Sequence, residues 1–447
     1  MRLNKGQTDA LDIVESGHNI FITGQGGVGK SELIKHIRTL FEDRGKVVHT
    51  TALTGIAALN VKGSTLHRWA GIGLGDKDQE ELLRKVRRHP KGKANWSNTS
   101  VLIVDEVSML SPDLFVKLDY IGRNMRRSSR PFGGIQLIFC GDFCQLGPVA
   151  VDAYCFESPL WSQCDFCICY LKENMRQSDA IFQKMLSEIR MGYASKETKE
   201  ILRSRIGVIV GTDEIQPTKL YSDRASVDAM NMKSLKKLPS LDNPTQLFEA
   251  FDSLTDGDYS EEQRSNFIGS LEKCCQAKKE LYLKVGAQVM LISNLDPDAG
   301  LVNGSRGVVT SFEFINEQER RPMVKFLNGL SLLITHHTWD FEIDDVTMIT
   351  RSQLPLILAW SSTIHKVQSL TIDCVEADLG DRIFGAGQFY TALSRVRSLE
   401  GLSITQINFD RLICDPKVRD FYEKLDADEL VTTEEIHMNR KQLTQDL

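Results

Sequence analysis

Residues 20–31, IFITGQGGVGKS, decide the fold, because a short apolar run leads there into a glycine-rich turn. The turn fits the phosphate-loop pattern of Gly, four residues and then Gly-Lys-Ser. Apolar residues at positions 33, 34, 37, 40 and 41 then recur at helical spacing, and Gly45 ends the predicted helix. In the order strand, glycine turn, helix, backbone N–H groups and the helix N-terminus bind phosphate. An ordinary glycine-rich turn is the alternative, which the Lys-Ser ending and both flanking elements disfavour.

Three more short apolar runs in the first third of the chain predict strands, and their alternation with amphipathic stretches is typical of a parallel α/β sheet. They are residues 47–52, 101–104 and 135–140. The same pattern returns late in the chain, at residues 219–222, 356–360, 372–377 and 401–405. Between the two groups, runs separated by Gly, Asn and Pro predict a small antiparallel barrel at residues 285–293, 306–314, 323–327 and 331–335. We therefore expect an α/β fold with two sheets of similar kind and an inserted β module.

Length and composition limit the classes of protein. Single hydrophobic cores stop growing near ~250–300 residues, so a chain of 447 residues suits about two to four modules. Hydrophobic residues make up 41% and charged residues 26%, as in soluble globular proteins, and the net charge of −6 disfavours nucleic-acid binding over the whole surface. The sequence has no apolar run of the ~18–20 residues that a membrane span needs, and its first residues resemble no signal or transit segment. With ten cysteines that lack the spacing of a small secreted scaffold, this predicts a soluble, intracellular protein without disulfides.

The residue types around the loop predict ATP and Mg²⁺ as cofactors. Lys30 would reach the β and γ phosphates, and the Ser31 hydroxyl would bind the metal ion. The run at 101–104 ends in Asp105 and Glu106, so we expect Asp105 to hold the metal and Glu106 to orient or deprotonate the attacking water. Gln145 follows the run at 135–140, and we expect it to sense the γ phosphate; an ordinary turn amide is the alternative. The predicted nucleotide-binding residues of the loop are Gly24, Gln25, Gly26, Gly27, Val28, Gly29, Lys30 and Ser31.

Two long segments carry a family resemblance. Residues 118–141, LDYIGRNMRRSSRPFGGIQLIFCG, and residues 283–309, LKVGAQVMLISNLDPDAGLVNGSRGVV, are similar to segments of the Pif-one (petite integration frequency) DNA helicases of superfamily 1B, which also holds RecD-like enzymes. The resemblance covers about residues 3–407. It implies two RecA-like P-loop domains in tandem, with a small wedge insertion in the first and an SH3-like β-barrel insertion in the second. The implied boundaries are 1–180 for the first domain with the wedge near 71–97, 181–280 and 346–426 for the second, 281–345 for the barrel, and 427–447 for a C-terminal tail.

The resemblance adds residues to the nucleotide site. Gln7 matches the glutamine that reads adenine in such helicases, with a solvated helix-start residue as the alternative. Arg176, in LKENMRQ at 171–177, and Arg395, in QFYTALSRVR at 388–397, match arginines that reach the γ phosphate. The second of these would come from the second α/β domain, so ATP held by the first would draw the two domains together.

The resemblance also implies contacts with single-stranded DNA, at Thr54 and Gly55 in TALTGIAA, at Thr65 and His67 in STLH, and at Thr363, His365 and Lys366 in TIHKVQ. The last motif departs from the family, which continues Lys-Ser-Gln-Gly where this chain has Lys366-Val367-Gln368-Ser369. The lost hydroxyl and the lost glycine affect the geometry of that loop. A smaller departure is Gly147 before Pro148, where the family commonly has two prolines.

The activity implied is that of an ATP-dependent DNA helicase which moves 5′-to-3′ on single-stranded DNA and unwinds duplexes, with G-quadruplexes and DNA–RNA hybrids as further substrates, in replication, repair, recombination or telomere maintenance. Its partners would be single-stranded DNA and forked or 5′-tailed duplex DNA, bound by a monomer and without a membrane. The alternative is a phosphate-loop ATPase that acts as a single-stranded DNA translocase or a protein-remodelling switch without processive unwinding. The second α/β half, with TIHKVQ and YTALSR, argues against a simple switch.

One motif raises a metal or redox hypothesis. Cys164 and Cys167 form a C-x-x-C pair, but no second ligand pair follows at zinc-finger spacing. Cys167, Cys169 and Leu171 alternate instead, as in a strand, so a strand is the favoured interpretation.

Overall fold

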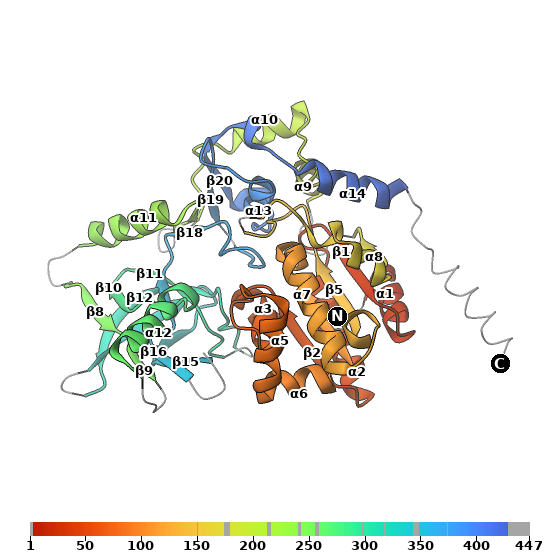
Figure 1. The fold of residues 1–447 in the computed structure, drawn as a ribbon. Coiled ribbons are helices and arrows are strands. Elements are labelled where there is room, and N and C mark those ends of the chain that lie inside the picture. Colours follow the sequence, from red (N-terminus) through yellow and green to blue (C-terminus); the bar gives the residue numbers. More distant parts are fainter. Residues whose placement is uncertain are drawn as a thin grey trace. The chain divides into compact units, whose positions relative to one another are not determined.

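The computed structural model describes residues 3–149, 151–173, 179–211, 216–239, 243–254, 259–296, 299–316, 319–342, 348–372 and 374–427, of which 59, 266, 270, 272–274, 341–342 and 426–427 are described by their backbone only. Contacts divide the chain into two compact units (Figure 1). The first is Met1–Ile206, Leu379–Leu399 and Gln406–Leu447, and the second is Gly207–Asp378 and Glu400–Thr405. The chain therefore crosses from one unit to the other four times, after Ile206, Asp378, Leu399 and Thr405.

The first unit is built on a six-stranded sheet in the order β3-β2-β4-β5-β1-β6. Each neighbouring pair is parallel. The strands are β1 (Ile20–Gly24), β2 (Val48–Ala52), β3 (Ser64–Thr65), β4 (Val101–Asp105), β5 (Gln136–Gly141) and β6 (Cys167–Leu171). The four strands predicted in the first third of the chain are confirmed, and so is the strand predicted through Cys167 and Leu171. Because β1, β4 and β5 end at one edge of the sheet, the residues that follow them can form one site.

Helices pack against this sheet and supply its core. The predicted helix after the glycine turn is α2 (Lys30–Asp43), which buries Leu33, Ile34, Ile37 and Phe41. The other helices of this unit are α1 (Lys5–Glu15), α3 (Gly55–Asn60), α4 (Leu66–Ala70), α5 (Gln79–Arg88), α6 (Pro90–Asn98), α7 (Pro112–Arg126), α8 (Pro159–Gln163), α9 (Ala180–Arg190), α10 (Lys196–Ser204), α13 (Gln388–Leu393) and α14 (Pro416–Ala427). Short 3-10 turns occur at Val107–Met109, Pro131–Gly134, Cys155–Glu157, Leu399–Gly401 and Phe409–Arg411.

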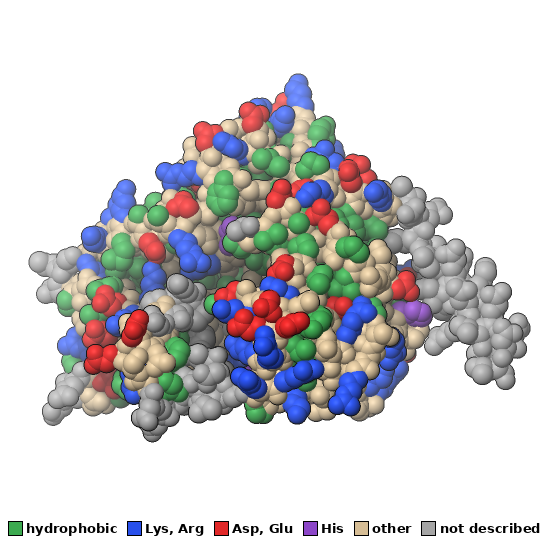
Figure 2. Space-filling model, viewed as in Figure 1, with side chains coloured by type: hydrophobic (Ala, Val, Ile, Leu, Met, Phe, Trp, Pro, Cys, Tyr) green, Lys and Arg blue, Asp and Glu red, His purple; other side chains and the backbone are tan. Residues whose placement is uncertain are grey.

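The segment predicted as a wedge insertion forms the helices α5 and α6. Trp96 of α6 packs on Trp69, with 4.6 Å between the ring centroids, and its indole N–H donates to the carbonyl of Ala70 at 3.0 Å. The apolar face of α5 is buried, while Lys and Arg side chains gather on the face that α5 and α6 turn to solvent (Figure 2). Residues 84–93, RKVRRHPKGK, are rich in Lys and Arg, and these basic side chains lie on the solvated face of the two helices.

The second unit has a four-stranded sheet in the order β18-β7-β19-β20. Its strands are β7 (Thr218–Tyr221), β18 (Ser361–Thr363), β19 (Val375–Leu379) and β20 (Leu402–Ile407), with α11 (Arg224–Lys237) following β7. The prediction that residues 356–360 belong to this sheet is wrong. Leu356–Leu358 forms β17, which pairs antiparallel with β11 of the neighbouring sheet, and the chain changes sheets at Ala359 and Trp360 before β18. The apolar run therefore marks β17, while the strand of this sheet is the polar but buried run Ser361–Thr363, which hydrophobicity alone does not reveal.

The inserted β module is antiparallel, as predicted. Its five-stranded sheet has the order β14-β13-β12-β11-β17, with β11 (Gln288–Leu291), β12 (Arg306–Phe314), β13 (Arg320–Phe326) and β14 (Ser331–Leu333), and it encloses a separate apolar core. Two smaller sheets, β15-β16-β9 and β10-β8, and α12 (Glu261–Cys274) complete the unit. Their strands are β8 (Gln246–Glu249), β9 (Phe251–Leu254), β10 (Glu280–Leu283), β15 (His337–Glu342) and β16 (Met348–Gln353). An SH3-like barrel stays a prediction.

Residues 346–426 were predicted to belong to the second domain, whereas contacts place Leu379–Leu399 and the residues from Gln406 onward with the first unit. The segment that carries α13 leaves the second sheet at the end of β19 and returns to it as β20. The predicted domain boundaries stay a prediction. No helix among the described residues is long and apolar enough to cross a membrane.

Candidate nucleotide site and DNA contacts

The glycines of the loop between β1 and α2 are required by its shape. Gly24 has φ 144°, and a Cβ there would lie 2.4 Å from the carbonyl oxygen of Leu171. Gly29, with φ 84°, is the N-cap residue of α2. Both values fall in the region that side chains disfavour, so only glycine fits without strain. The loop therefore presents backbone rather than side chains ahead of the helix N-terminus.

Lys30 and Ser31 lie in the first turn of α2, where backbone N–H groups have no partner within the helix. The Lys30 ammonium donates to the carbonyls of Gly24 at 2.6 Å and Gln25 at 3.1 Å, so the side chain folds back onto the first residues of the loop. The Ser31 side chain is exposed. This geometry leaves a cation and a hydroxyl at the mouth of the loop.

The acidic pair stands at the end of β4. Asp105 is 5% exposed, and its Oδ1 accepts the Glu106 N–H at 2.9 Å. Burial, together with the charge of Glu106, raises the pKa of Asp105 to about 7. Glu106 has φ 55° and ψ 42°, a left-handed conformation that strains a residue with a side chain. A buried carboxylate next to a strained acidic residue is an arrangement that functional sites retain at the expense of stability.

Gln145 and Arg395 meet at the same loop. The Arg395 Nη2 donates to the Gln145 Oε1 at 3.3 Å and to the Ser394 Oγ at 2.7 Å. Arg395 is 2% exposed, and burial lowers its pKa while the charge of Glu106 raises it. A Cβ on Gly26 would lie 3.5 Å from Arg395 Nη2. Two residues predicted on separate motifs are thus brought together beside the phosphate loop.

Gln7 contacts the loop through α1. It is 1% exposed, its Nε2 donates to the Gly29 carbonyl at 3.4 Å, and its Oε1 accepts the Asn4 N–H at 3.1 Å. Since Asn4 in turn accepts the Gln7 N–H at 2.9 Å, the two residues form the capping box of α1. Its burial excludes the alternative of a solvated helix-start residue. Arg176 lies outside the described residues.

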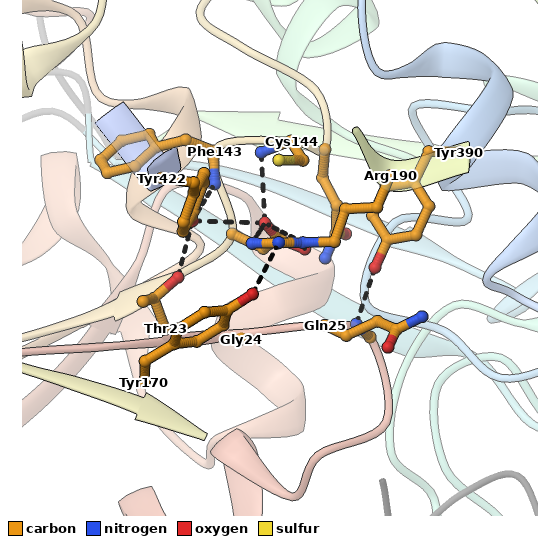
Figure 3. A network of polar contacts seen from close by, with 12 residues as sticks. Thr23, Gly24, Gln25, Phe143, Cys144, Tyr170, Arg190, Tyr390 and Tyr422 are labelled. Carbon is orange, nitrogen blue, oxygen red and sulfur yellow. Dashed lines mark hydrogen bonds and ion pairs between the residues drawn. The ribbon is translucent and has the colours of Figure 1, made fainter. Parts of the chain in front are cut away.

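Sequence reasoning missed the buried aromatic and charged residues around the loop (Figure 3). The Tyr390 hydroxyl accepts the Gly26 N–H at 2.9 Å. Behind β1, Arg190 and Asp142 form an ion pair of 2.8 Å that is 4% and 0% exposed, and Tyr422 lies against it. Tyr390 lies in the same motif, at 388–397, from which Arg395 was predicted, so that motif could have indicated it. Tyr422 and Arg190 lie in no comparable motif.

Two of the residues predicted to contact DNA in the first unit cap helices. The Thr54 hydroxyl accepts the Ala57 N–H at 3.2 Å at the start of α3, and the Thr65 hydroxyl caps α4 by accepting the Arg68 N–H at 3.3 Å. Gly55 is exposed. His67 is partly buried, and this burial lowers its pKa, which favours the neutral imidazole. The caps fix the shape of both predicted DNA loops.

The predicted contacts of the second unit follow β18. The Thr363 hydroxyl accepts the Lys366 N–H at 3.3 Å, and burial and the charge of Arg224 lower the pKa values of both His365 and Lys366. Lys366 lines a cavity of about 190 Å³. Ser369, where the family has glycine, has φ 69°. The loop therefore keeps the left-handed backbone of a glycine while carrying a side chain.

The second cysteine of the C-x-x-C motif begins a strand. Cys167 begins β6 as predicted, and burial raises the pKa of Cys164 to about 12 and that of Cys169 to about 12, which keeps the thiols protonated. In the described ranges, no three or more His, Cys, Asp or Glu side chains gather in the way that an all-protein metal site requires, and the cysteines are free thiols.

The glycine loop after β1, the acidic pair after β4 and the parallel sheet that carries them define a phosphate-loop protein of the α/β class. The chain matches the PIF1-like helicase family over residues 2–200 and the 2B domain of DNA helicase Pif1 over residues 266–312. It is similar to the crystal structure of Pif1 helicase from Candida albicans, with a TM-score of 0.85 and 36% identity over 95% of this chain and 100% of that one. The chain belongs to the PIF1-like helicase family, and the predicted α/β class is confirmed.

Other relatives agree with this placement. The chain is 40% identical over 428 residues to the ATP-dependent DNA helicase PIF1 of Mus musculus. That match covers 95% of this chain but only 63% of the relative, so the chain spans less than two thirds of that curated protein. Pif1 helicase from Bacteroides in complex with ADP-AlF3 and single-stranded DNA has a TM-score of 0.68 and 26% identity, over 96% of this chain and 98% of that one.

Proposed function

We propose that this chain is an ATP-dependent DNA helicase that moves 5′-to-3′ on single-stranded DNA and separates duplex strands. The observation that carries the proposal is the meeting of Gln145 and Arg395 beside the phosphate loop, 3.3 Å apart, in a chain of the PIF1-like helicase family. A protein that only binds nucleotide does not require an arginine from a distant motif at its phosphate loop. An arginine that approaches from another motif couples hydrolysis to the movement of its own segment.

ATP with Mg²⁺ fits the residues around the loop. The buried Nε2 of Gln25 has no hydrogen-bond partner among the described residues, and the first turn of α2 offers further donors to phosphate. The Asp105 carboxylate and the Ser31 hydroxyl are the hard oxygen ligands that Mg²⁺ prefers. When bound, MgATP supplies a γ phosphoryl group with its charge partly neutralised and activated for attack by water.

The residues of the chain then have separate tasks. Lys30 holds the β and γ phosphates, and Gln7 positions the adenine end through α1. Glu106, beside the metal ligand Asp105, accepts a proton from the attacking water. Arg395, with Gln145, would contact the γ phosphate, and Arg176 supplies a second guanidinium there.

The strand of DNA would contact both units. In the first, Thr54, Gly55, Thr65 and His67 line the two capped loops, and in the second Thr363, His365 and Lys366 follow β18. A partly buried lysine next to Arg224 gains from a phosphate neighbour, because the pKa of Lys366 is lowered by burial and by that like charge. The helices α5 and α6 take the role of the strand-separating wedge, residues 281–345 that of the SH3-like barrel, and the chain acts as a monomer.

Overhang polarity tests the proposal. Labelled duplexes with a 5′ or a 3′ single-stranded tail are incubated with the chain, ATP and Mg²⁺, and strand separation is measured. Unwinding of the 5′-tailed duplex alone is expected, together with ATP hydrolysis stimulated by single-stranded DNA. Stimulated hydrolysis without unwinding of either duplex would instead indicate a translocase, and hydrolysis indifferent to DNA would indicate a protein-remodelling switch.

A further inference from the structure

One hydroxyl behind the phosphate loop joins the ends of two neighbouring strands (Figure 3). The Tyr422 oxygen lies 2.6 Å from the Thr23 Oγ1, accepts the Phe143 N–H at 3.1 Å, and lies 3.3 Å from the Asp142 Oδ1, to which it donates. Thr23 immediately precedes Gly24 of the loop, and Phe143 stands two positions before Gln145. A residue of the C-terminal helix α14 thus links the loop to the turn that carries the γ-phosphate sensor.

The Tyr422 hydroxyl uses its full capacity for hydrogen bonds. With its single proton given to Asp142, Tyr422 accepts from Thr23 and from Phe143, which uses both lone pairs. Each of these residues is buried. A fully satisfied network in a low-dielectric interior has one favoured geometry, because leaving any member unpaired is costly.

Arg190 of α9 completes the set. Its Nε and Nη2 donate to the Asp142 Oδ1 at 3.1 and 2.8 Å, and its Nη1 donates to the Tyr170 hydroxyl at 3.0 Å. Its guanidinium also lies 4.2 Å from the centroid of the Tyr422 ring. The Asp142 Oδ1 in addition accepts the Cys144 N–H at 3.2 Å, so the residue just before Gln145 is held as well.

We propose that Tyr422 and Arg190 are positioning residues for ATP hydrolysis, which hold Gln145 in register with the phosphate loop through Thr23 and the turn at Asp142–Cys144. The inference rests on the proposed function. It gives α14, the helix that carries Tyr422, a role at the nucleotide site. Tyr422 acts there through Thr23 and the turn at Asp142–Cys144 rather than by touching a nucleotide-binding residue of the loop. The ring of Tyr422 and its neighbour Phe421, which stacks on Phe156 at 4.5 Å, dock the helix independently of the hydroxyl.

Tyr422→Phe tests the proposal, since it removes the hydroxyl and keeps the ring. We expect kcat for DNA-stimulated ATP hydrolysis to fall about fivefold, the effect of roughly 1 kcal/mol on a barrier, with the Kd of a non-hydrolysable ATP analogue changed by less than about twofold. In a Gln145→Ala background the same change should have no further effect on kcat, because Tyr422 would act through Gln145. Arg190→Lys, which keeps the charge and loses the fork, should behave like Tyr422→Phe.

Tyr154→Phe is the matched control, because it keeps the ring that packs on Phe143 and removes a hydroxyl that lies 3.5 Å from Asp415 beside the start of α14. Amide hydrogen exchange provides a readout without turnover: residues 141–147 should exchange faster in Tyr422→Phe and as in the parent chain in Tyr154→Phe. Effects of Tyr422→Phe and Gln145→Ala that multiply, or unchanged exchange at 141–147, overturn the proposal. A parent chain without ATPase activity overturns the proposed function, and hydrogen exchange then decides alone whether Tyr422 holds the turn.

Discussion

The Tyr390 hydroxyl accepts a hydrogen bond from the N–H of Gly26 across 2.9 Å, although the two residues are 364 positions apart in the chain. This N–H belongs to the loop that would surround the phosphates, so the tyrosine occupies a donor that nucleotide could use. The same motif places Arg395 against Gln145. The segment at 388–397, which carries Tyr390 and Arg395, therefore contacts the phosphate loop.

Removing this hydroxyl should change nucleotide binding. Tyr390→Phe removes the 2.9 Å hydrogen bond to the Gly26 N–H, which destabilises the nucleotide-free state by about 1 kcal/mol, whereas a nucleotide-bound state in which phosphate accepts this N–H is not affected. We therefore expect the Kd for a fluorescent ADP or ATP analogue to fall by about fivefold. A weaker affinity would mean that the hydroxyl itself contacts the phosphates.

Loss of the Lys30 ammonium should abolish hydrolysis. Lys30→Ala removes the cation at the mouth of the loop, and we expect DNA-stimulated ATP turnover to fall by roughly 100-fold or more. Lys35→Ala, five positions along α2 on its exposed face and paired with Glu32, is the matched control and should leave turnover unchanged. Near-normal turnover in Lys30→Ala would end the assignment of the nucleotide site.

Glu106→Gln should separate binding from chemistry. The amide keeps the size and polarity of the side chain but cannot accept a proton, so we expect the variant to bind ATP and DNA while hydrolysing ATP roughly 100-fold more slowly. Equilibrium binding and single-turnover hydrolysis measure the two steps. Failure to bind ATP would show that Glu106 supports the strained turn after β4 rather than the reaction.

Ser369→Gly should stabilise the second unit. The φ of 69° costs a serine about 1 kcal/mol, part of which the extra freedom of glycine in the unfolded chain offsets. We expect the free energy of unfolding in urea to rise by about 0.5 kcal/mol. Ser369→Ala keeps the strain and serves as the control; equal stability of the two variants would show that the left-handed backbone carries no strain here.

The partly buried His67 should make the fold sensitive to mild acid. Burial lowers the pKa of His67 from its ordinary value of 6.5, so the unfolded chain binds the proton more tightly than the folded chain. The contribution to stability is therefore full above pH 6.5 and is lost as the pH falls from there toward the lower folded pKa. We expect Tm to fall between about pH 7 and 5, and to fall less steeply in His67→Gln. An identical slope in the variant would indicate that other groups cause the loss.

The nucleotide loop and its acidic pair were predictable because their signals are local. Residues 24–31 combine glycines, Lys-Ser and flanking periodicity in one short stretch, and Asp105 directly ends an apolar run that became β4. A parallel sheet then places both at one edge without further information. The resemblance to a family contributed Gln7 and Arg395, whose motifs give little indication of a site by themselves.

What the sequence could not reveal depends on contacts between distant positions. Phe143 and Tyr422 are 279 positions apart, and a buried tyrosine looks like any core aromatic in the sequence. The change of sheet at Ala359 and Trp360 leads from the apolar β17 into β18, a buried strand of Ser and Thr that carries no hydrophobic signal. The strands β8 and β9 were also missed, since they alternate between partly exposed and exposed residues and so lack an apolar run.

The chain passes between the units four times, after Ile206, Asp378, Leu399 and Thr405. Each unit is therefore assembled from separate segments of the sequence rather than from one continuous stretch. A single protease cut at one passage would give two fragments, and at least one of them would still contain parts of both units. Neither unit can be expressed as a contiguous fragment, because the second lacks β20 if the gene is truncated at Asp378. A domain swap or a circular permutation would have to preserve all four of these connections. We therefore expect the chain to tolerate insertions in its loops far more readily than the exchange of a whole unit.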